Sequence, residues 1–270
     1  HLEELDLSGL DLIDLNELPP LSQLTRLALG GVRQRDSLDL SGAHRLSSLE
    51  LRGCHTLTEV RGLETLTQLT KIDLRACAGL VTSAERSSLL LAQLRSLTDL
   101  TELSLSDVEG LASVNALSSL NKLRGLTLVD CETLTDVSAL VDFKSLTQLD
   151  LSGCINIDRL GLVSRLTQLE TLTLSRCPQL RHWVSRREMR ALRALRLDGS
   201  GALSVHLSNS PKLECLSLSG CTKLTKLEIH GLPELRELNV NRLTSLSRAT
   251  LSDLPLVHDL NLKKSHALTN

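Results

Sequence analysis

The sequence predicts an α/β solenoid, a horseshoe or right-handed superhelix whose concave face is a parallel sheet of about twelve short strands. First, the pattern Leu-x-x-Leu-x-Leu recurs twelve times at intervals of 21 to 23 residues, with one interval of 31. Second, the 270 residues contain one Phe, one Trp, one Met and no Tyr. A core built almost entirely from Leu indicates that stacked coils repeat the same small packing arrangement.

Each repeat contributes one short strand to the predicted sheet. In Leu149-Asp150-Leu151 the two Leu point to one side and Asp150 to the other. A single coil cannot bury its apolar side, so stacked coils must share one core. The strands should centre on Leu5, Leu27, Leu49, Ile72, Leu103, Leu126, Leu149, Leu172, Leu195, Leu216, Leu238 and Leu260.

The return path of each coil forms the convex side, mostly from turns and short strands. About eight extra residues follow the repeat that starts at Leu69 and predict one short helix within residues 83–95. After residue 213 the spacing changes to Leu-x-x-Leu-x-Leu and predicts further strands around 226–230 and 248–252. A similar half-period occurs at Leu24, Arg35 and Leu46, with Leu38 and Leu40 completing the pattern.

These motifs resemble the leucine-rich repeat family. The stretch Thr-Leu-Thr-Asp-Val-Ser-Ala-Leu at residues 133–140, followed by Leu-Thr-Gln-Leu-Asp-Leu-Ser-Gly-Cys at residues 146–154, is similar to the short 22–23-residue type of internalins and phosphatase-regulating repeat proteins. Cys replaces the usual ladder Asn, as in the cysteine-containing repeats of F-box proteins. The resemblance covers the whole chain and implies the fold. It names no ligand, because the family binds many different ones.

The domain organisation follows from the same register. Residues 1–270 form a single repeat domain, in which the pattern is already running at Leu2 and still running at Leu262. Repeat arrays normally end in polar or disulfide-bonded caps. We therefore expect a fragment of a longer protein that lacks both caps.

Six of the seven cysteines lie three residues after the last Leu of a strand, and stacking places them in a column. They are Cys54, Cys77, Cys131, Cys154, Cys177 and Cys221. Metal binding and disulfides are the alternatives, but no Cys-x-x-Cys pair occurs. We expect buried reduced thiols, which fit an intracellular, cytoplasmic location. Cys215 differs because it occupies an outward strand position.

The remaining composition argues against an enzyme. The eight His are scattered, and no phosphate loop, nucleophile elbow or zinc motif occurs. We predict no catalytic residue, no metal site and no cofactor. The net charge of −2 disfavours a nucleic-acid partner, and no apolar segment is long enough to span a membrane. By register, Trp183, Phe143 and Met189 are core residues.

The sequence therefore predicts a protein-binding scaffold that uses its concave face. Charged residues there can make directional contacts that Ser and Thr cannot. The predicted partner-binding residues are Arg75, Asp130, Asp150, Arg176, Arg196 and Asp198. Alternatives are the substrate-receptor part of a ubiquitin ligase, or a subunit of a ribonucleoprotein or cytoskeletal assembly. A competing location is a convex edge rich in Arg, formed by Arg181, Arg186, Arg187, Arg190 and Arg193.

Overall fold

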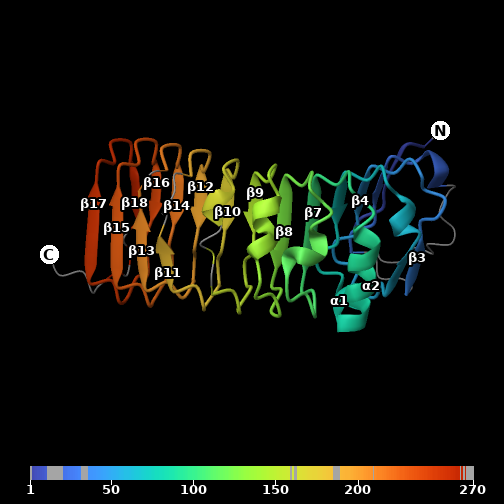
Figure 1. Cartoon of the computed structure of the whole chain (residues 1–270), viewed down its shortest axis with the longest axis horizontal. Helices are drawn as coiled ribbons and strands as arrows, with labels where there is room; N and C mark the ends of the chain where they lie inside the picture. Colours follow the sequence, from blue (N-terminus) through green and yellow to red (C-terminus); the bar gives the residue numbers. More distant parts are fainter. Residues whose placement is uncertain are drawn as a thin grey trace.

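The computed structural model of the chain is an elongated array of stacked coils (Figure 1). It describes residues 2–10, 21–31, 36–158, 160, 163–184, 189–208, 210–261, 263 and 265. The coils follow one another in chain order along the long axis, from the N-terminal coils at the right of Figure 1 to the C-terminal coils at the left. The predicted solenoid is thereby confirmed. That residues 1–270 are one domain without caps stays a prediction.

Twelve strands form one parallel sheet, here called the main sheet, on the side that the sequence predicts as the concave face. Its strands are β1 (Glu4–Asp6), β2 (Arg26–Ala28), β4 (Ser48–Glu50), β6 (Lys71–Asp73), β7 (Glu102–Ser106), β8 (Gly125–Val129), β9 (Gln148–Asp150), β10 (Thr171–Thr173), β12 (Ala194–Arg196), β14 (Cys215–Ser217), β16 (Glu237–Asn239) and β18 (Asp259–Asn261). All twelve predicted strand positions are confirmed. In register, each buried Leu or Ile stacks on its equivalent in the next coil, as Leu149 does on Leu172.

Short strands also form on the opposite side of the coils, in two separate groups. The C-terminal group is a four-stranded parallel sheet of β11 (His182–Val184), β13 (Ser204–Leu207), β15 (Lys226–His230) and β17 (Arg248–Ser252). The strands predicted around 226–230 and 248–252 are therefore confirmed. The N-terminal group is the pair β3 (Ser37–Asp39) and β5 (Glu59–Arg61), where Leu38 fits the half-period. Arg35 lies outside the described residues.

Helical segments occupy the opposite side between these two groups and at a few turns. The predicted helix is α2 (Ala84–Leu94), and the hydroxyl of Ser83 caps it by accepting a hydrogen bond from the Arg86 N–H at 3.3 Å. Gln93 donates to the Val60 carbonyl at 3.0 Å, so α2 covers the free edge of β5. Not predicted were the single turn α1 (Ala78–Val81) and the 3₁₀ turns η2 (Leu21–Gln23), η3 (Leu63–Thr65), η4 (Val114–Leu117), η5 (Ser138–Asp142) and η6 (Val163–Arg165).

A continuous Leu-rich core fills the space between the two sides. It runs through the described residues from Leu24 to Leu246. Phe143, Met189 and Trp183 are all buried, as their register predicts. The six predicted partner-binding residues lie outside this core, on the main sheet and on the turns at its edges.

Candidate functional site

The turns that follow three main-sheet strands, β1, β6 and β9, share one design. An Asp at or near the end of the strand accepts a hydrogen bond from the backbone N–H two residues later. Asp6 does so from Ser8 at 3.0 Å, Asp73 from Arg75 at 3.1 Å and Asp150 from Ser152 at 2.9 Å. The hydroxyl of Ser152 also donates to Asp150, at 2.5 Å. The predicted binding residue Asp150 is thus also a turn-forming residue with a fixed orientation.

Asp130 and Arg176 occupy the position that directly follows the N–H donor in the turns of the neighbouring coils. The coil between them has a glycine at this position, which lets their side chains meet. Both have a left-handed backbone, with φ of 54° and 57°, and the intervening coil carries Gly153 at the same position. A Cβ on Gly153 would lie 1.7 Å from Oδ1 of Asp130. Because glycine has no Cβ, the Asp130 carboxylate can lie over Gly153 and pair with Arg176 at 3.1 Å. The ion pair therefore spans three coils.

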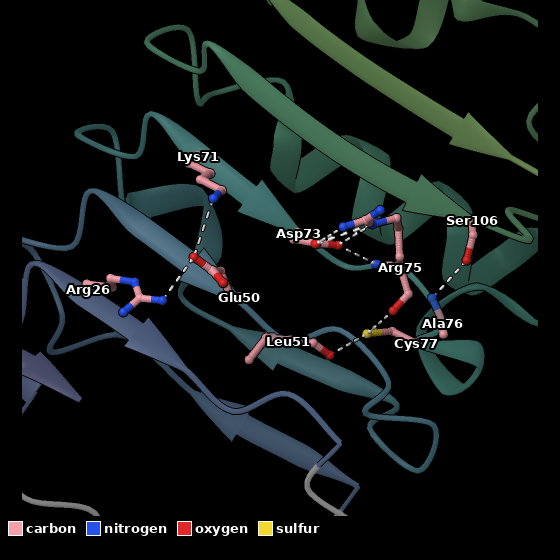
Figure 2. Close-up of polar contacts among 9 residues, drawn as sticks. All are labelled: Arg26, Glu50, Leu51, Lys71, Asp73, Arg75, Ala76, Cys77 and Ser106. Atoms are coloured by element: carbon pink, nitrogen blue, oxygen red, sulfur yellow. Dashed lines mark hydrogen bonds and ion pairs between the residues drawn. The ribbon is translucent and has the colours of Figure 1, made fainter. Parts of the chain in front are cut away.

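Arg75 folds back onto Asp73 of its own coil (Figure 2). Its Nε and Nη2 lie 3.0 and 2.6 Å from the two carboxylate oxygens. Burial by itself would raise the pKa of Asp73, but the hydrogen bonds and charge of Arg75 outweigh it, so that this pKa falls below its ordinary value. The same hydrogen bonds raise the pKa of Arg75, to which the charge of Asp150 also contributes. The pair is ionised at neutral pH.

A second charged network lies on the first coils of the main sheet. Glu50 stands between Arg26 and Lys71, at 3.4 and 3.5 Å from their nitrogen atoms (Figure 2). Arg26 is also within 4.0 Å of Glu4 and within 3.9 Å of Asp6. Exposed pairs of this kind stabilise the fold only slightly, so their main effect is to fix charge positions on the surface.

The C-terminal part of the predicted set contains Arg196 and Asp198. Oδ1 of Asp198 accepts hydrogen bonds from Ser219 N–H at 2.8 Å and from the Ser217 hydroxyl at 2.5 Å, both in the next coil. Arg196 is exposed. It lines a cavity of about 250 Å³ in the main-sheet surface together with Cys215, Leu216, Ser217, Glu237, Leu238, Asn239, Asp259 and Asn261.

A similar hollow lies on the central strands and contains Asp150. Its volume is about 210 Å³, and it extends from β7 to β10. Besides Asp150 it is lined by Glu102, Ser104, Gly125, Leu126, Thr127, Gln148, Leu149, Thr171 and Thr173. Both hollows are shallow, open and predominantly polar, a lining suited to a polar protein surface.

The structure thus pairs two of the six predicted residues, Asp130 with Arg176. Arg75, Asp150 and Asp198 instead contact residues outside the predicted set. Sequence reasoning missed Asp73, Gly153 and the serines that hold the carboxylates. The Asp-x-Ser spacing at 6–8 and 150–152 is a signal that could have identified the turn. In the competing cluster, Arg193 forms an ion pair with Glu214, Arg181 and Arg190 are exposed, and Arg186 and Arg187 lie outside the described residues.

The cysteine column is buried beneath these turns. All seven cysteines are free thiols, and only Cys215 is partly exposed. Figure 2 shows the Cys77 thiol pointing to the Leu51 carbonyl of the preceding coil. The Sγ–O distances are 3.1 Å for Cys54 to Leu29, 2.9 Å for Cys77 to Leu51, 3.2 Å for Cys154 to Leu128, 3.2 Å for Cys177 to Leu151 and 3.0 Å for Cys221 to Leu197. Each of these buried thiols therefore has a hydrogen-bond acceptor in the preceding coil.

The column predicts a loss of stability at alkaline pH. Burial raises the pKa of Cys77 to about 12 and that of Cys177 to about 11, from an ordinary value of 9.0. In the unfolded chain these two thiols ionise above pH 9, whereas in the folded chain they stay neutral until the pH approaches 11 to 12. The stabilisation is therefore complete below pH 9 and is lost as the pH rises toward 11 to 12. Urea unfolding should give a lower free energy of unfolding at pH 10.5 than at pH 8, with a smaller pH dependence in Cys77→Ala. Equal values for the wild type at both pH values would contradict this.

A metal centre and a membrane-spanning helix are both absent from the described residues. Within them, no group of three or more His, Cys, Asp or Glu side chains is placed to hold a metal ion. They include no helix long and apolar enough to cross a lipid bilayer. The intracellular location stays a prediction.

The chain is a repeat solenoid. It is built of stacked coils, most of them 21 to 23 residues long, with a twelve-stranded parallel sheet on one side and the buried cysteine column inside. A family model described as R13L1/DRL21 LRRs matches residues 81–154. The structure resembles an internalin (inlF) of Listeria monocytogenes, with a TM-score of 0.58 and 17% identity over 99% of this chain and 85% of that one. A second internalin from the same organism gives a TM-score of 0.46 and 16% identity, over 86% and 82% of the two chains. No curated protein matches the sequence.

The chain is a leucine-rich repeat protein. The identities to the solved structures are low, so the likeness concerns the fold. What the surface recognises has to be argued from its own side chains.

Proposed function

We propose that the protein is a binding scaffold that holds a partner protein across the main sheet. The contacting residues are Arg75, Asp130, Asp150, Arg176, Arg196 and Asp198. The observation that carries the proposal is the pair of polar hollows on this surface, one containing Asp150 and the other Arg196.

Preorganisation supports this surface as the binding face. The Asp150 carboxylate is held by Ser152, the Asp198 carboxylate by Ser217 and Ser219, and the Asp130 carboxylate by Arg176. Side chains already held in one position lose little conformational entropy when a partner binds. Oxygen and guanidinium atoms that are not used internally can still accept or donate hydrogen bonds to a partner.

The composition of the surface also predicts the kind of contact. Outward positions of the main sheet carry Ser, Thr, Asn, Asp, Glu and Arg but no aromatic side chain. Tight interfaces usually depend on large anchors that become fully buried, and aromatic side chains are prominent among them. We therefore expect a polar contact of moderate affinity, for which the charged residues determine which partner is accepted.

Charge reversal tests the proposal. The double variant Asp150→Arg with Arg196→Glu leaves the net charge of the protein unchanged but reverses the charge of the predicted contact residue in each hollow. Wild-type protein and this variant are used as baits in extract from the native cell, and captured proteins are quantified by mass spectrometry. A partner retained by the wild type should fall by about tenfold or more with the variant.

The matched control is Arg95→Glu with Glu109→Arg, two exposed positions near α2 that also conserve net charge. Capture should be unchanged in this control and in Arg186→Glu with Arg187→Glu. Thermal melts establish that all variants fold. Loss of the partner with the Arg186 and Arg187 variant, and not with the Asp150 and Arg196 variant, would place the contact on the convex edge instead.

A further inference from the structure

A large hollow lies away from the main-sheet surface, along the turns that lead into β10, β12 and β14. It has a volume of about 1030 Å³ and is here called the edge groove. Its described lining is Ser164, Arg165, Thr167, Gln168, Arg190, Ala191 and Lys212. These residues come from three successive coils, which lie next to one another in the solenoid (Figure 1).

The charge of the edge groove is one-sided. Arg165, Arg190 and Lys212 are all exposed, and its described lining includes no Asp or Glu. Within the described part of the chain, Arg165 and Lys212 form no ion pair. In this they differ from Lys122, which pairs with Asp99 at 2.6 Å, and from Arg193, which pairs with Glu214. The groove therefore concentrates positive potential on a protein whose net charge is −2.

The polar groups beside these cations suit an oxyanion. The hydroxyl of Thr167 and the amide of Gln168 can donate hydrogen bonds, and Arg guanidinium groups bind carboxylate or phosphate oxygens in a bidentate manner. The described lining has no aromatic side chain on which a nucleic-acid base could stack. The chemistry favours an acidic protein segment over a single-stranded nucleic acid.

The spacing of the coils determines the shape of the segment. Neighbouring parallel strands lie about 4.8 Å apart, so the backbones that carry Arg165 and Lys212, two coils apart, are separated by about 10 Å along the solenoid axis. An extended peptide in the polyproline II conformation advances about 3.1 Å per residue with about three residues per turn, so it covers that distance in about three residues. Acidic side chains three residues apart then lie on the same face of the peptide and can face both ends of the groove.

We propose that the edge groove binds an extended acidic segment of a partner protein, with negatively charged side chains about three residues apart. This site is separate from the main-sheet surface and does not depend on the function proposed for it. A neighbouring hollow of about 640 Å³ shares Arg190 but contains Asp253, Pro211 and Pro233, and it is not part of the site.

Fluorescence polarisation with defined peptides tests the proposal on the full chain. The probe is a labelled peptide of Gly and Ser with Glu at every third position, and the comparison peptide has Gln in place of Glu. The Glu peptide should bind and the Gln peptide should not. Arg165→Glu with Lys212→Glu should raise the Kd of the Glu peptide by about tenfold or more, because attraction is replaced by repulsion.

The matched control is Arg95→Glu with Lys223→Glu, which makes the same change in net charge at exposed positions outside the groove. Its Kd should stay within about twofold of the wild type after screening by about 0.15 M salt. Tighter binding of a phosphoserine version, weakened by the same groove variant, supports the site with phosphate as the preferred oxyanion. Equal losses in both double variants overturn the proposal, as does a thymidine oligonucleotide that outcompetes both acidic peptides.

Discussion

Replacing Leu149 by Asp is expected to unfold the central coils. The Leu149 side chain is 1% exposed and stacks between Leu126 and Leu172 of the adjacent strands. A carboxylate there would be buried without a partner, at a cost of about 5 kcal/mol or more, comparable with the whole stability of many domains. Urea unfolding followed by circular dichroism should show a loss of the cooperative transition.

The neighbouring residue provides the control for this prediction. Asp150→Ala removes only the hydrogen bonds from Ser152 at the surface and should cost about 1 kcal/mol. Two variants of similar stability would show that the inward and outward assignment of the strand is wrong.

The second large effect is expected at Gly201, where two coils approach closely. A Cβ at this position would lie 1.8 Å from the Pro178 carbonyl oxygen and 2.6 Å from its carbon, both of them backbone atoms. The Gly201 N–H also donates to the Cys177 carbonyl at 3.0 Å, which fixes the spacing of the coils. Gly201→Ala must push these backbones apart and should lower the free energy of unfolding by about 3 kcal/mol.

Gly42→Ala is the matched substitution, because a Cβ at Gly42 meets no atom within 4 Å. Its effect should be within about 1 kcal/mol, and it can be slightly stabilising because Ala restricts the unfolded chain. If Gly201→Ala were as mild as Gly42→Ala in the same urea titration, the close contact with Pro178 would not restrict the site.

Most of the fold could be predicted from the repeat register. Every main-sheet strand could be located because a Leu spacing that recurs through the chain leaves one way to stack the coils. The convex strands β15 and β17 were predictable for the same reason, since both have strand spacing. The turn α1 and the 3₁₀ turns were not, because such short segments carry too little periodicity to distinguish a tight helical turn from a loop.

The candidate site was less predictable than the fold. Residues facing outward could be listed from the alternation along each strand, but their partners depend on side-chain conformation. The Asp130–Arg176 pair could be predicted only by knowing that Gly153 leaves room between the two side chains. The Arg75–Asp73 pair depends on the Arg75 side chain folding back onto its own coil. The edge groove combines turn residues from three coils, and the sequence suggested only Arg190 among its three cations.

The interrupted second sheet has a mechanical consequence. From β11 onward, hydrogen-bonded strands run along both sides of the coils and resist bending on both sides. Between β5 and β11 the main sheet continues alone, and α1, α2 and 3₁₀ turns take the place of the second sheet. An α-helix is about 10 Å wide, about twice the spacing of strands, and acts as a wedge on that side. Bending of the array should therefore concentrate in the coils between residues 78 and 180, next to the hollow that contains Asp150.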